Sequence, residues 1–233
     1  MLATFNDISP LVKARDELDM ANRRLTLVSS ITNHDLMNKL SVTSGYLELL
    51  RKGVDGMTGL NYLDKIDRAT KEAEYLIQFT RDYQKEQIGP PRWHSIGEAF
   101  REVWGQLDTR DVVLDINIGE IELFSDSMFS KVIYNLIDNS LRYGETISRI
   151  NLEYEIVPEG LALRYGDDGV GILAENKEKI FERGFGKNTG LGLGLCRDIL
   201  WMTNMTIKEQ GEPGKGAQFE ILIPNGSYRL GPE

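Results

Sequence analysis

The residues with the clearest chemical potential lie in one stretch, Ile31–Leu40, inside a long helical pattern. His34 and Asp35 are adjacent, and Asn38 follows His34 by four residues, on the same face of a helix. A neutral histidine ring nitrogen is a nucleophile, and a neighbouring carboxylate can orient the ring or accept its proton. A lone helical histidine is also common as a surface residue, so this chemistry requires that the rest of the chain supply a substrate.

A glycine-rich segment, Gly184–Leu195, is a candidate for that substrate site. Its glycines disfavour a helix, which predicts a loop up to about Leu191 and a helix from about Gly192. A loop entering a helix exposes unpaired N–H donors and the positive end of the helix dipole, and both favour phosphate. The segment lacks the GxxxxGK[ST] order and does not follow a strand, so it is neither a Walker A loop nor a dinucleotide-binding fingerprint.

Two more groups of residues suit a nucleotide. Asn135 and Asn139, with Asp138 and Arg142, form a polar strip on a predicted helix, where amide oxygens can complete the shell of Mg²⁺ and Arg142 can pair with a phosphate. The run Asp167-Asp168-Gly169-Val170-Gly171-Ile172 follows a predicted strand. Its carboxylate can accept from an exocyclic amine, and its glycines let a flat ring approach. Taken singly, the strip also fits a solvated helix face, and the short DxGxG pattern also fits a turn.

The first half of the chain predicts a helical hairpin. A heptad seam, which implies a partner helix, runs through Leu11, Ala14, Leu18, Ala21, Leu25 and Val28. The helix is expected to end near Gly53, and a second helix spans about Gly59 to Gln87. Its predicted buried face is Leu63, Ile66, Ala69, Ala73, Leu76, Ile77 and Phe79 or Thr80. A lone hairpin cannot bury its apolar stripe, so we expect a dimeric four-helix bundle. Such a hairpin also fits a pure dimerisation stalk. Gly89-Pro90-Pro91 marks the domain boundary.

The second half mixes helical and alternating periodicity. Ser95 and Glu98 form a capping-box pattern at the start of a helix that reaches Leu107. Residues 125–127 are expected to cap a helix whose apolar positions are Phe129, Val132, Ile133, Leu136, Ile137, Ser140 and Leu141. Strands are predicted at 112–118, 121–124, 149–157, 161–165, 206–209 and 217–223, and residues after Pro224 read as a loose tail. His94 and Cys196 are interpreted as a surface or packing residue and a small core residue.

Composition limits the possible functions. The chain has 233 residues, 41% hydrophobic and 27% charged, as in an ordinary globular protein. Residues 1–88 carry 12 Lys+Arg and 13 Asp+Glu, so −8 of the net −9 falls on residues 89–233. This acidic half argues against nucleic acid as a partner. One cysteine rules out a disulfide framework within the chain and fits a reducing compartment. No apolar run approaches about 18 residues, the length needed to span a membrane.

The order and spacing of these groups resemble the sensor histidine kinase family. The Asn135-x-x-x-Asn139 helix, Asp167-x-Gly169-x-Gly171, Phe181 in an Ile-Phe-Glu segment, and Gly190-Leu191-Gly192-Leu193-Gly194 resemble the N, G1, F and G2 boxes of its ATP-binding domain. His34-Asp35-Leu36-Met37-Asn38 resembles its H box. The resemblance covers roughly residues 10 to 224. Its Ile180–Leu193 run is most similar to PAS-linked kinases of methanogenic archaea.

The resemblance implies a role for each matching residue. His34 would accept the γ-phosphate of ATP, Asp35 would orient the ring or act as the base, and Asn38 would position water for dephosphorylating a partner. Asn135 and Asn139 would hold Mg²⁺ and phosphates. The other expected ATP-binding residues are Arg142, Tyr143, Asp167, Gly169, Gly171, Lys187, Gly190, Leu191, Gly192, Leu193 and Gly194. Asp168 stands where the family usually has asparagine. The lid between Gly171 and Gly190 is short. Lys39 replaces the proline frequent five residues after the histidine, so a straighter helix is expected.

The expected fold is therefore an α-helical hairpin dimerisation domain at 10–88, followed by an α+β two-layer sandwich ATP-binding domain of the Bergerat or GHKL type at 89–224. Residues 1–9 would end a preceding domain, of the PAS type, or mark a boundary of the segment, and 225–233 would be a tail. The expected function is ATP- and Mg²⁺-dependent autophosphorylation of His34 and phosphotransfer to a response regulator receiver domain. The expected setting is a cytoplasmic homodimer, with any membrane anchor outside this segment. The alternatives are a related ATPase or protein-serine kinase with a purely dimerising hairpin, and a non-catalytic scaffold.

Overall fold

The computed structural model describes residues 34–85, 91–109, 111–125, 127–185 and 190–231, with single residues and pairs between 15 and 29. Leu18 and Leu25 of the predicted heptad seam are described and exposed. The other four seam positions, residues 1–9 and Lys187 lie outside the described residues. None of the described helices is long and apolar enough to cross a membrane.

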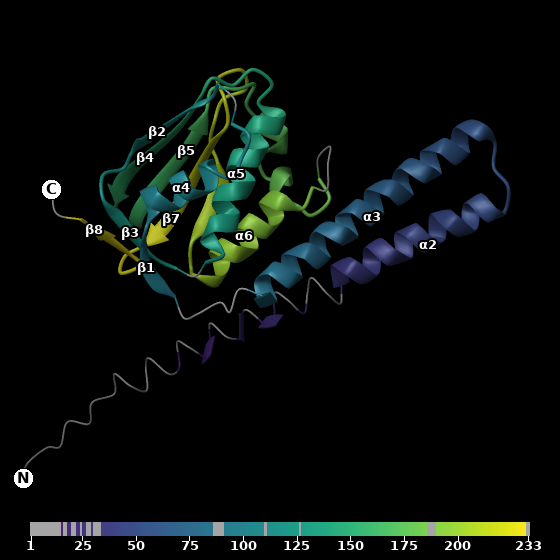
Figure 1. The fold of residues 1–233 in the computed structure, drawn as a ribbon, viewed down its shortest axis with the longest axis horizontal. Coiled ribbons are helices and arrows are strands. Elements are labelled where there is room, and N and C mark those ends of the chain that lie inside the picture. The colour runs from purple at the N-terminus through teal and green to yellow at the C-terminus, as the bar shows by residue number, and fades with distance from the viewer. Residues whose placement is uncertain are drawn as a thin grey trace, which may run out of the picture.

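The hairpin consists of α2 (Met37–Arg51) and α3 (Gly56–Lys85), which run side by side and project from the rest of the chain (Figure 1). The predicted end near Gly53 is confirmed, because this glycine has a φ of 81° just after α2. Helix α3 begins three residues before the predicted Gly59. The carboxylate of Asp55 accepts a hydrogen bond from the Thr58 N–H at 2.8 Å and so caps this earlier start.

One apolar face of the hairpin stays uncovered within a single chain. Helix α2 has no buried residue, and Leu63 and Ile77 of α3, predicted as buried, are 51% and 47% exposed. Ala69, Ala73, Leu76 and Phe79 are buried as predicted. The physical reason for the difference is that one hairpin has no second helix pair to cover its stripe.

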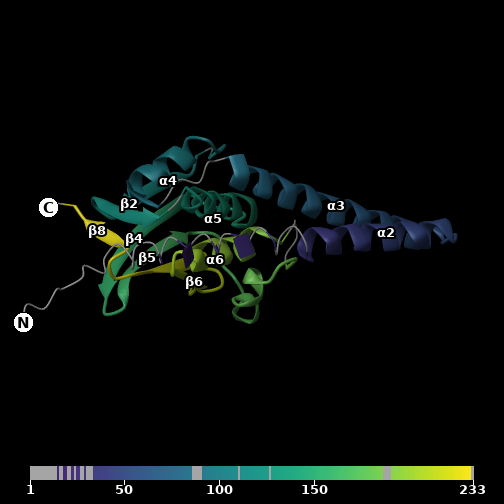
Figure 2. The ribbon, with the colours of Figure 1, turned by 90° about the horizontal axis from the view of Figure 1, so that it is seen from below.

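The second half of the chain folds as a two-layer α+β sandwich, as predicted. Its main sheet has the order β2-β4-β5-β7-β6, with β2 and β4 parallel and every other pair antiparallel. Helices α4 (Ile96–Trp104), α5 (Phe129–Tyr143) and α6 (Gly192–Met202) cover one face of it (Figures 1 and 2). The five strands are β2 (Val113–Asn117), β4 (Arg149–Val157), β5 (Gly160–Asp167), β6 (Thr206–Glu209) and β7 (Gln218–Pro224). Two 3₁₀ turns, Ala174–Asn176 and Lys179–Phe181, lie between β5 and α6.

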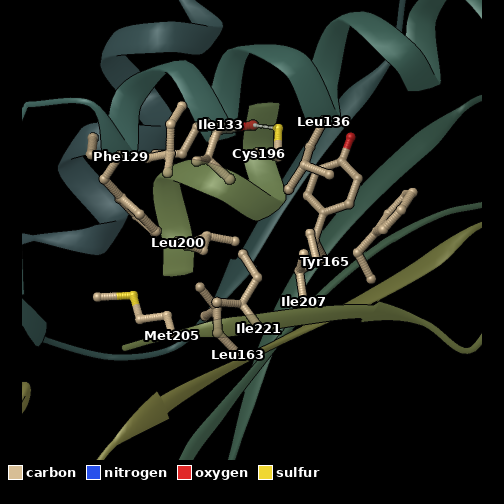
Figure 3. Packing of buried hydrophobic residues seen from close by; sticks show 14 of the residues in the cluster. Phe129, Ile133, Leu136, Leu163, Tyr165, Cys196, Leu200, Met205, Ile207 and Ile221 are labelled. Carbon is tan, nitrogen blue, oxygen red and sulfur yellow. Dashed lines mark hydrogen bonds between the residues drawn. The ribbon is translucent and has the colours of Figure 1, made fainter. Parts of the chain in front are cut away.

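The core fills the space between α5, α6 and the sheet. Figure 3 shows Phe129, Ile133 and Leu136 of α5 facing Leu163 and Tyr165 of β5, with other core residues around them. Cys196 is fully buried there, as predicted, and burial raises the pKa of its thiol to about 12. Leu76 and Phe79 of α3 belong to the same apolar cluster. The C-terminal part of the hairpin is therefore packed against the sandwich.

Three predictions about the edges of this domain were incomplete. A small sheet of order β1-β3-β8 contains the unpredicted strands β1 (Arg92–Ser95) and β8 (Tyr228–Leu230) on either side of β3 (Ile121–Ser125). Residues 228–230 are thus not a loose tail. The cap position of α5 is Met128, without a side-chain hydrogen bond, and not Ser125 or Ser127; Asp126 lies outside the described residues. The Ser125 hydroxyl instead lies 3.1 Å from His94 Nε2, which makes His94 a packing residue.

Candidate functional site

The H-box histidine lies at an irregular helical turn. Residues 34–36 form a π-helical turn, and regular α-helix begins at Met37. Helix α2 runs without a break through Lys39, as expected from the missing proline, and the π turn lies before it. Such π turns are frequent at functional sites. The side chain of His34 is 80% exposed, and its Nδ1 lies 2.9 Å from Asp35 Oδ1. Asn38, four residues on, is exposed on α2.

Asp35 is the buried member of this group, with 7% of its surface exposed. Its second oxygen, Oδ2, accepts from the guanidinium of Arg183, which comes from the segment just before the glycine-rich loop. A carboxylate can only accept a hydrogen bond, so the contact of Asp35 with His34 Nδ1 fits the tautomer that carries the ring proton on Nδ1. In that tautomer Nε2 carries the nucleophilic lone pair, and the ring of His34 is largely exposed. The orienting role of Asp35 stays a prediction.

The predicted metal ligands lie on one side of α5. Asn135 is buried, and its Oδ1 accepts a hydrogen bond from the Tyr75 hydroxyl of α3 at 3.2 Å. Asn139 is half-buried. Gly192, the first residue of α6, lies so close to Asn135 that an added Cβ would stand 3.1 Å from its Oδ1. The Asn135 amide therefore lies beside the start of α6, and hard neutral oxygens of this kind suit Mg²⁺. Among the described residues, no cluster of three or more His, Cys, Asp or Glu offers another metal site.

Arg142 and Tyr143 are less closely integrated. Arg142 Nε donates to both oxygens of Asp138, each at 2.7 Å, on the outer part of α5. Tyr143 is 39% exposed at the end of the helix. Both residues are on the expected helix, and the hydrogen bonds of Arg142 join it to Asp138 of the same predicted strip.

Asp167 is fixed at the end of β5 by three hydrogen bonds that use both its carboxylate oxygens. Its Oδ1 accepts from the N–H groups of Gly169 and Ala217, each at 3.0 Å, and its Oδ2 accepts from the Ser140 hydroxyl at 2.5 Å. The Tyr165 hydroxyl donates in turn to Ser140 at 2.9 Å. This network of α5 and β5 holds the carboxylate rigidly, as recognition of a ring amine requires. Ser140 was predicted only as a position on the helix face and Tyr165 only as part of a strand, because their part in the network depends on contacts between elements.

Asp168, where the family usually has asparagine, is a structural residue. It accepts from the Ser148 N–H and hydroxyl and from the Arg149 N–H, at 2.8, 2.5 and 3.0 Å. Partial burial opposes ionisation, but these hydrogen bonds outweigh it and lower the pKa of Asp168 below its usual value. Asp168 thus fastens the start of β4 through Ser148 and Arg149.

The glycines are required by close backbone contacts. A Cβ on Gly169 would lie 2.7 Å from the Gly144 backbone, and one on Gly171, which has a φ of 70°, would lie 2.6 Å from the Glu212 carbonyl. Gly190 has a φ of 62°, and its Cβ would lie 2.4 Å from the Phe185 carbonyl. No other residue fits these positions without moving the chain.

The glycine-rich loop enters α6 as predicted, with the helix beginning at Gly192. The cap position, Leu191, is buried and gives no side-chain hydrogen bond to the first turn of the helix. Gly194 is buried and Leu193 is half-buried. Free N–H groups at a helix start form an anion site, which fits the phosphate-binding role expected for 190–194.

The fold thus brings together two groups that are far apart in sequence. The Gly184 N–H donates to the Gly190 carbonyl at 2.9 Å, and Arg183, next to Gly184, contacts Asp35. The H box therefore abuts the base of the glycine-rich loop. Arg183 and Tyr75 were not predicted as site residues, since no local pattern marks them. The one sequence feature that could have pointed to Arg183 is its position directly after the Ile180-Phe181-Glu182 segment.

This combination of fold and site has counterparts among known proteins. Residues 126–227 match the family described as Histidine kinase-, DNA gyrase B-, and HSP90-like ATPase. These residues contain α5, β4 to β7 and α6, so the match covers most of the sandwich and less than half of the chain. With the helical hairpin before this domain, the chain has the fold of a histidine kinase catalytic core.

Particular relatives agree with this class. The chain is similar to "Sporulation kinase C" of Bacillus subtilis (25% identical, covering 96% of this chain and 56% of that protein). It is also similar to "Methanogenesis regulatory histidine kinase FilI" of Methanothrix harundinacea (24% identical, covering 92% and 27%). The solved structure "histidine kinase ThkA (TM1359) in complex with response regulator protein TrrA (TM1360)" matches with a TM-score of 0.53 at 19% identity, covering 96% of this chain and 69% of that one. The chain spans little more than half of the first relative and about a quarter of the second.

Proposed function

We propose that this chain is the catalytic core of a two-component sensor histidine kinase. It uses ATP to phosphorylate its own His34 and passes the phosphoryl group to an aspartate of a response regulator receiver domain. The observation that carries the proposal is the His34–Asp35 pair at 2.9 Å beside the glycine-rich loop of a domain from an ATP-binding family. The named histidine kinase relatives support it.

The proposed reaction starts from the tautomer of His34 that carries its proton on Nδ1. The Nε2 lone pair of His34 attacks the γ-phosphorus, the bond from that phosphorus to the bridging oxygen of ADP breaks, and an N–P bond forms. The positive charge that develops on the ring is relieved as Nδ1 gives its proton to Asp35. Buried Asp35 thus has two roles, orienting the ring before attack and accepting the proton afterwards.

The nucleotide is proposed to lie between α5 and the start of α6. Asp167 would accept from the adenine amine, Gly169 and Gly171 would allow the ring to approach, and residues 190–194 would donate N–H groups to the phosphates. Asn135 and Asn139 would hold Mg²⁺, which supplies neutralising charge to the phosphate oxygens when bound. Arg142, Tyr143 and Lys187 remain proposed contacts at the rim.

The uncovered hairpin face supports a homodimer. Exposed Leu40, Leu47 and Leu63 would pack against the same residues of a second copy in a four-helix bundle. We place this segment on the cytoplasmic side, where ATP and receiver domains are found. Asn38 lies one turn from His34 and is exposed, so a docked receiver domain would meet it. We propose that Asn38 positions the water that dephosphorylates this partner.

The test is incubation with γ-labelled ATP and Mg²⁺. Label that is stable in alkali, lost in acid and absent from His34→Gln supports phosphohistidine formation. Acid-stable label that survives His34→Gln would instead indicate a protein-serine kinase, and ADP release without any label would indicate a plain ATPase. For the phosphatase step, receiver-domain dephosphorylation that is unchanged in Asn38→Ala would refute the role of Asn38.

A further inference from the structure

Arg183 joins the hairpin to the ATP-binding domain. Its Nη1 donates to Asp35 Oδ2, and its Nη2 donates to Asp198 Oδ2 on α6 at 2.5 Å. The side chain of Arg183 is 28% exposed and that of Asp35 is 10% exposed, so solvent screens this contact only partly. A guanidinium can bind two carboxylates at once through its planar fork, which a lysine ammonium does less well. Arg183 therefore ties the H-box acid to α6.

A second contact fixes the same junction one residue further on. Arg68 of α3 donates through Nη2 to the Gly184 carbonyl at 2.8 Å. Arg68 is held in turn by Glu72, which is 3% exposed and also pairs with Lys39 of α2 at 2.5 Å. Both helices of the hairpin thus contribute to the surface that receives residues 183–184.

These contacts lead directly to the phosphate loop. Gly184 pairs with Gly190 through its N–H at 2.9 Å. The aliphatic stem of Arg183 lies against the first turn of α6, because a Cβ on Gly194 would stand 3.3 Å from Arg183 Cγ. Two successive contacts therefore connect Asp35 to the backbone that is proposed to hold the phosphates.

All of these groups belong to one chain, and the connection between its two parts is short. Helix α3 ends at Lys85 and β1 begins at Arg92. The seven residue steps from Lys85 to Arg92 reach at most about 25 Å when fully extended. Leu76 and Phe79 of α3 are moreover packed in the core of the domain that follows. The chain's own ATP-binding domain is therefore held beside its own hairpin.

We infer that Arg183 is a positioning residue that docks the ATP-binding domain on the H-box acid of the same chain, so that His34 is phosphorylated in cis. This inference rests on the proposed kinase function. Arg183 acts through Asp35 and the loop backbone, without touching the reacting nitrogen. It sets the distance between the ATP-binding domain and the His34 ring.

The positioning role is tested with Arg183→Gln. Autophosphorylation at saturating ATP should fall about 10- to 100-fold, the range of a charge-assisted hydrogen bond to a buried carboxylate. Affinity for a fluorescent ATP analogue should stay within about twofold, because Arg183 lies outside the proposed nucleotide contacts. Arg183→Lys should recover part of the rate, since it keeps the charge but loses the fork.

The chain offers a closely matched control. Arg164 also bridges two carboxylates, Glu155 at 2.5 Å and Glu220 at 3.2 Å, and its side chain is 34% exposed, but it pairs with residues of the sheet only. Arg164→Gln should leave the rate unchanged. The positioning role is overturned if Arg183→Gln is as fast as wild type or faster, if its nucleotide affinity falls in parallel with its rate, or if Arg164→Gln is equally slow.

The cis assignment is tested without altering Arg183. His34→Gln and Asn139→Ala chains carrying different tags are co-expressed, and assemblies containing both are isolated by two successive affinity steps. Transfer in cis predicts no label, because neither chain has both an acceptor and an intact nucleotide site. Label on the Asn139→Ala chain would show transfer in trans and refute the assignment. If wild-type protein itself takes no label, the proposed function fails, whereas labelled wild type with labelled mixed assemblies refutes only the cis step.

Discussion

Tyr75 provides the sharpest test of how the hairpin affects the nucleotide site. Its hydroxyl donates to Asn135 Oδ1 at 3.2 Å, and this oxygen is the proposed Mg²⁺ ligand. Burial raises the pKa of Tyr75, so the hydroxyl stays protonated and remains a donor at neutral pH. The hydroxyl and the metal ion therefore compete for one carboxamide oxygen. Tyr75→Phe removes the competitor and keeps the ring in its packed position.

The size of the effect follows from the length of the bond. Hydroxyl hydrogen bonds are commonly about 2.7–2.8 Å, so a bond of 3.2 Å belongs at the weak end of the range. A neutral bond of this kind contributes about 0.5–1 kcal/mol, which corresponds to about 2- to 5-fold in an equilibrium constant. Tyr75→Phe should therefore bind ATP about 2- to 5-fold more tightly in the presence of Mg²⁺.

Isothermal titration calorimetry with ATP, with and without Mg²⁺, measures this difference. The gain should disappear when the metal is chelated, because the oxygen then has no metal to bind. Tyr46→Phe is the control, since Tyr46 packs against Tyr62 in the hairpin and has the same chemistry far from α5. Unchanged or weaker binding of Mg²⁺ and ATP by Tyr75→Phe would refute the competition for Asn135.

Three other changes have predicted outcomes. Gly190→Ala should reduce ATP affinity at least about 10-fold by calorimetry, because its Cβ would meet the Phe185 carbonyl at 2.4 Å and move the loop. Lys177→Met leaves the fully buried Glu209 side chain, 2.8 Å away, without its cation, and should lower the free energy of unfolding in urea by about 3 kcal/mol. Adding Glu209→Gln should recover much of that loss. In Asp168→Asn, the free energy of unfolding should fall less steeply than in wild type as the pH is lowered into the acid range. The lowered pKa of Asp168 gives stability that is present above its unfolded value of 3.8 and is lost as pH falls through the folded value. An unchanged urea midpoint from pH 5 to pH 3 in wild type would contradict this.

Elements with a regular local pattern could be predicted from the sequence. The alternation of Arg149–Val157 and its return predicted β4 and β5, which pair in antiparallel register as expected. The helical spacing from Phe129 to Leu141 predicted α5, and every position on its predicted face but Leu141 is buried. The glycines before Leu193 predicted where α6 begins. These signals are local, so they are readable without knowing the fold.

The missed features depend on contacts between distant segments. Arg183 and Asp35 are 148 residues apart, and Tyr75 and Asn135 are 60 apart, so no periodicity connects them. The cap predicted from Ser125 failed because His94, from a strand that was not predicted, lies against that hydroxyl. In each case the partner of the side chain is supplied by a distant segment that the fold brings close.

Strand β8 is only three residues long, yet it closes one side of the small sheet. Tyr228–Leu230 pairs with β3, whose other side is paired with β1, and Arg229 lies 3.7 Å above the Trp93 ring. If the chain ended at Pro224, one side of β3 would have a row of unpaired backbone groups. Two residues of this strand, Ile121 and Leu123, are apolar. Such an open edge recruits strands from other molecules. The final strand therefore acts as a guard against aggregation, and its short length and arginine are what such a guard requires.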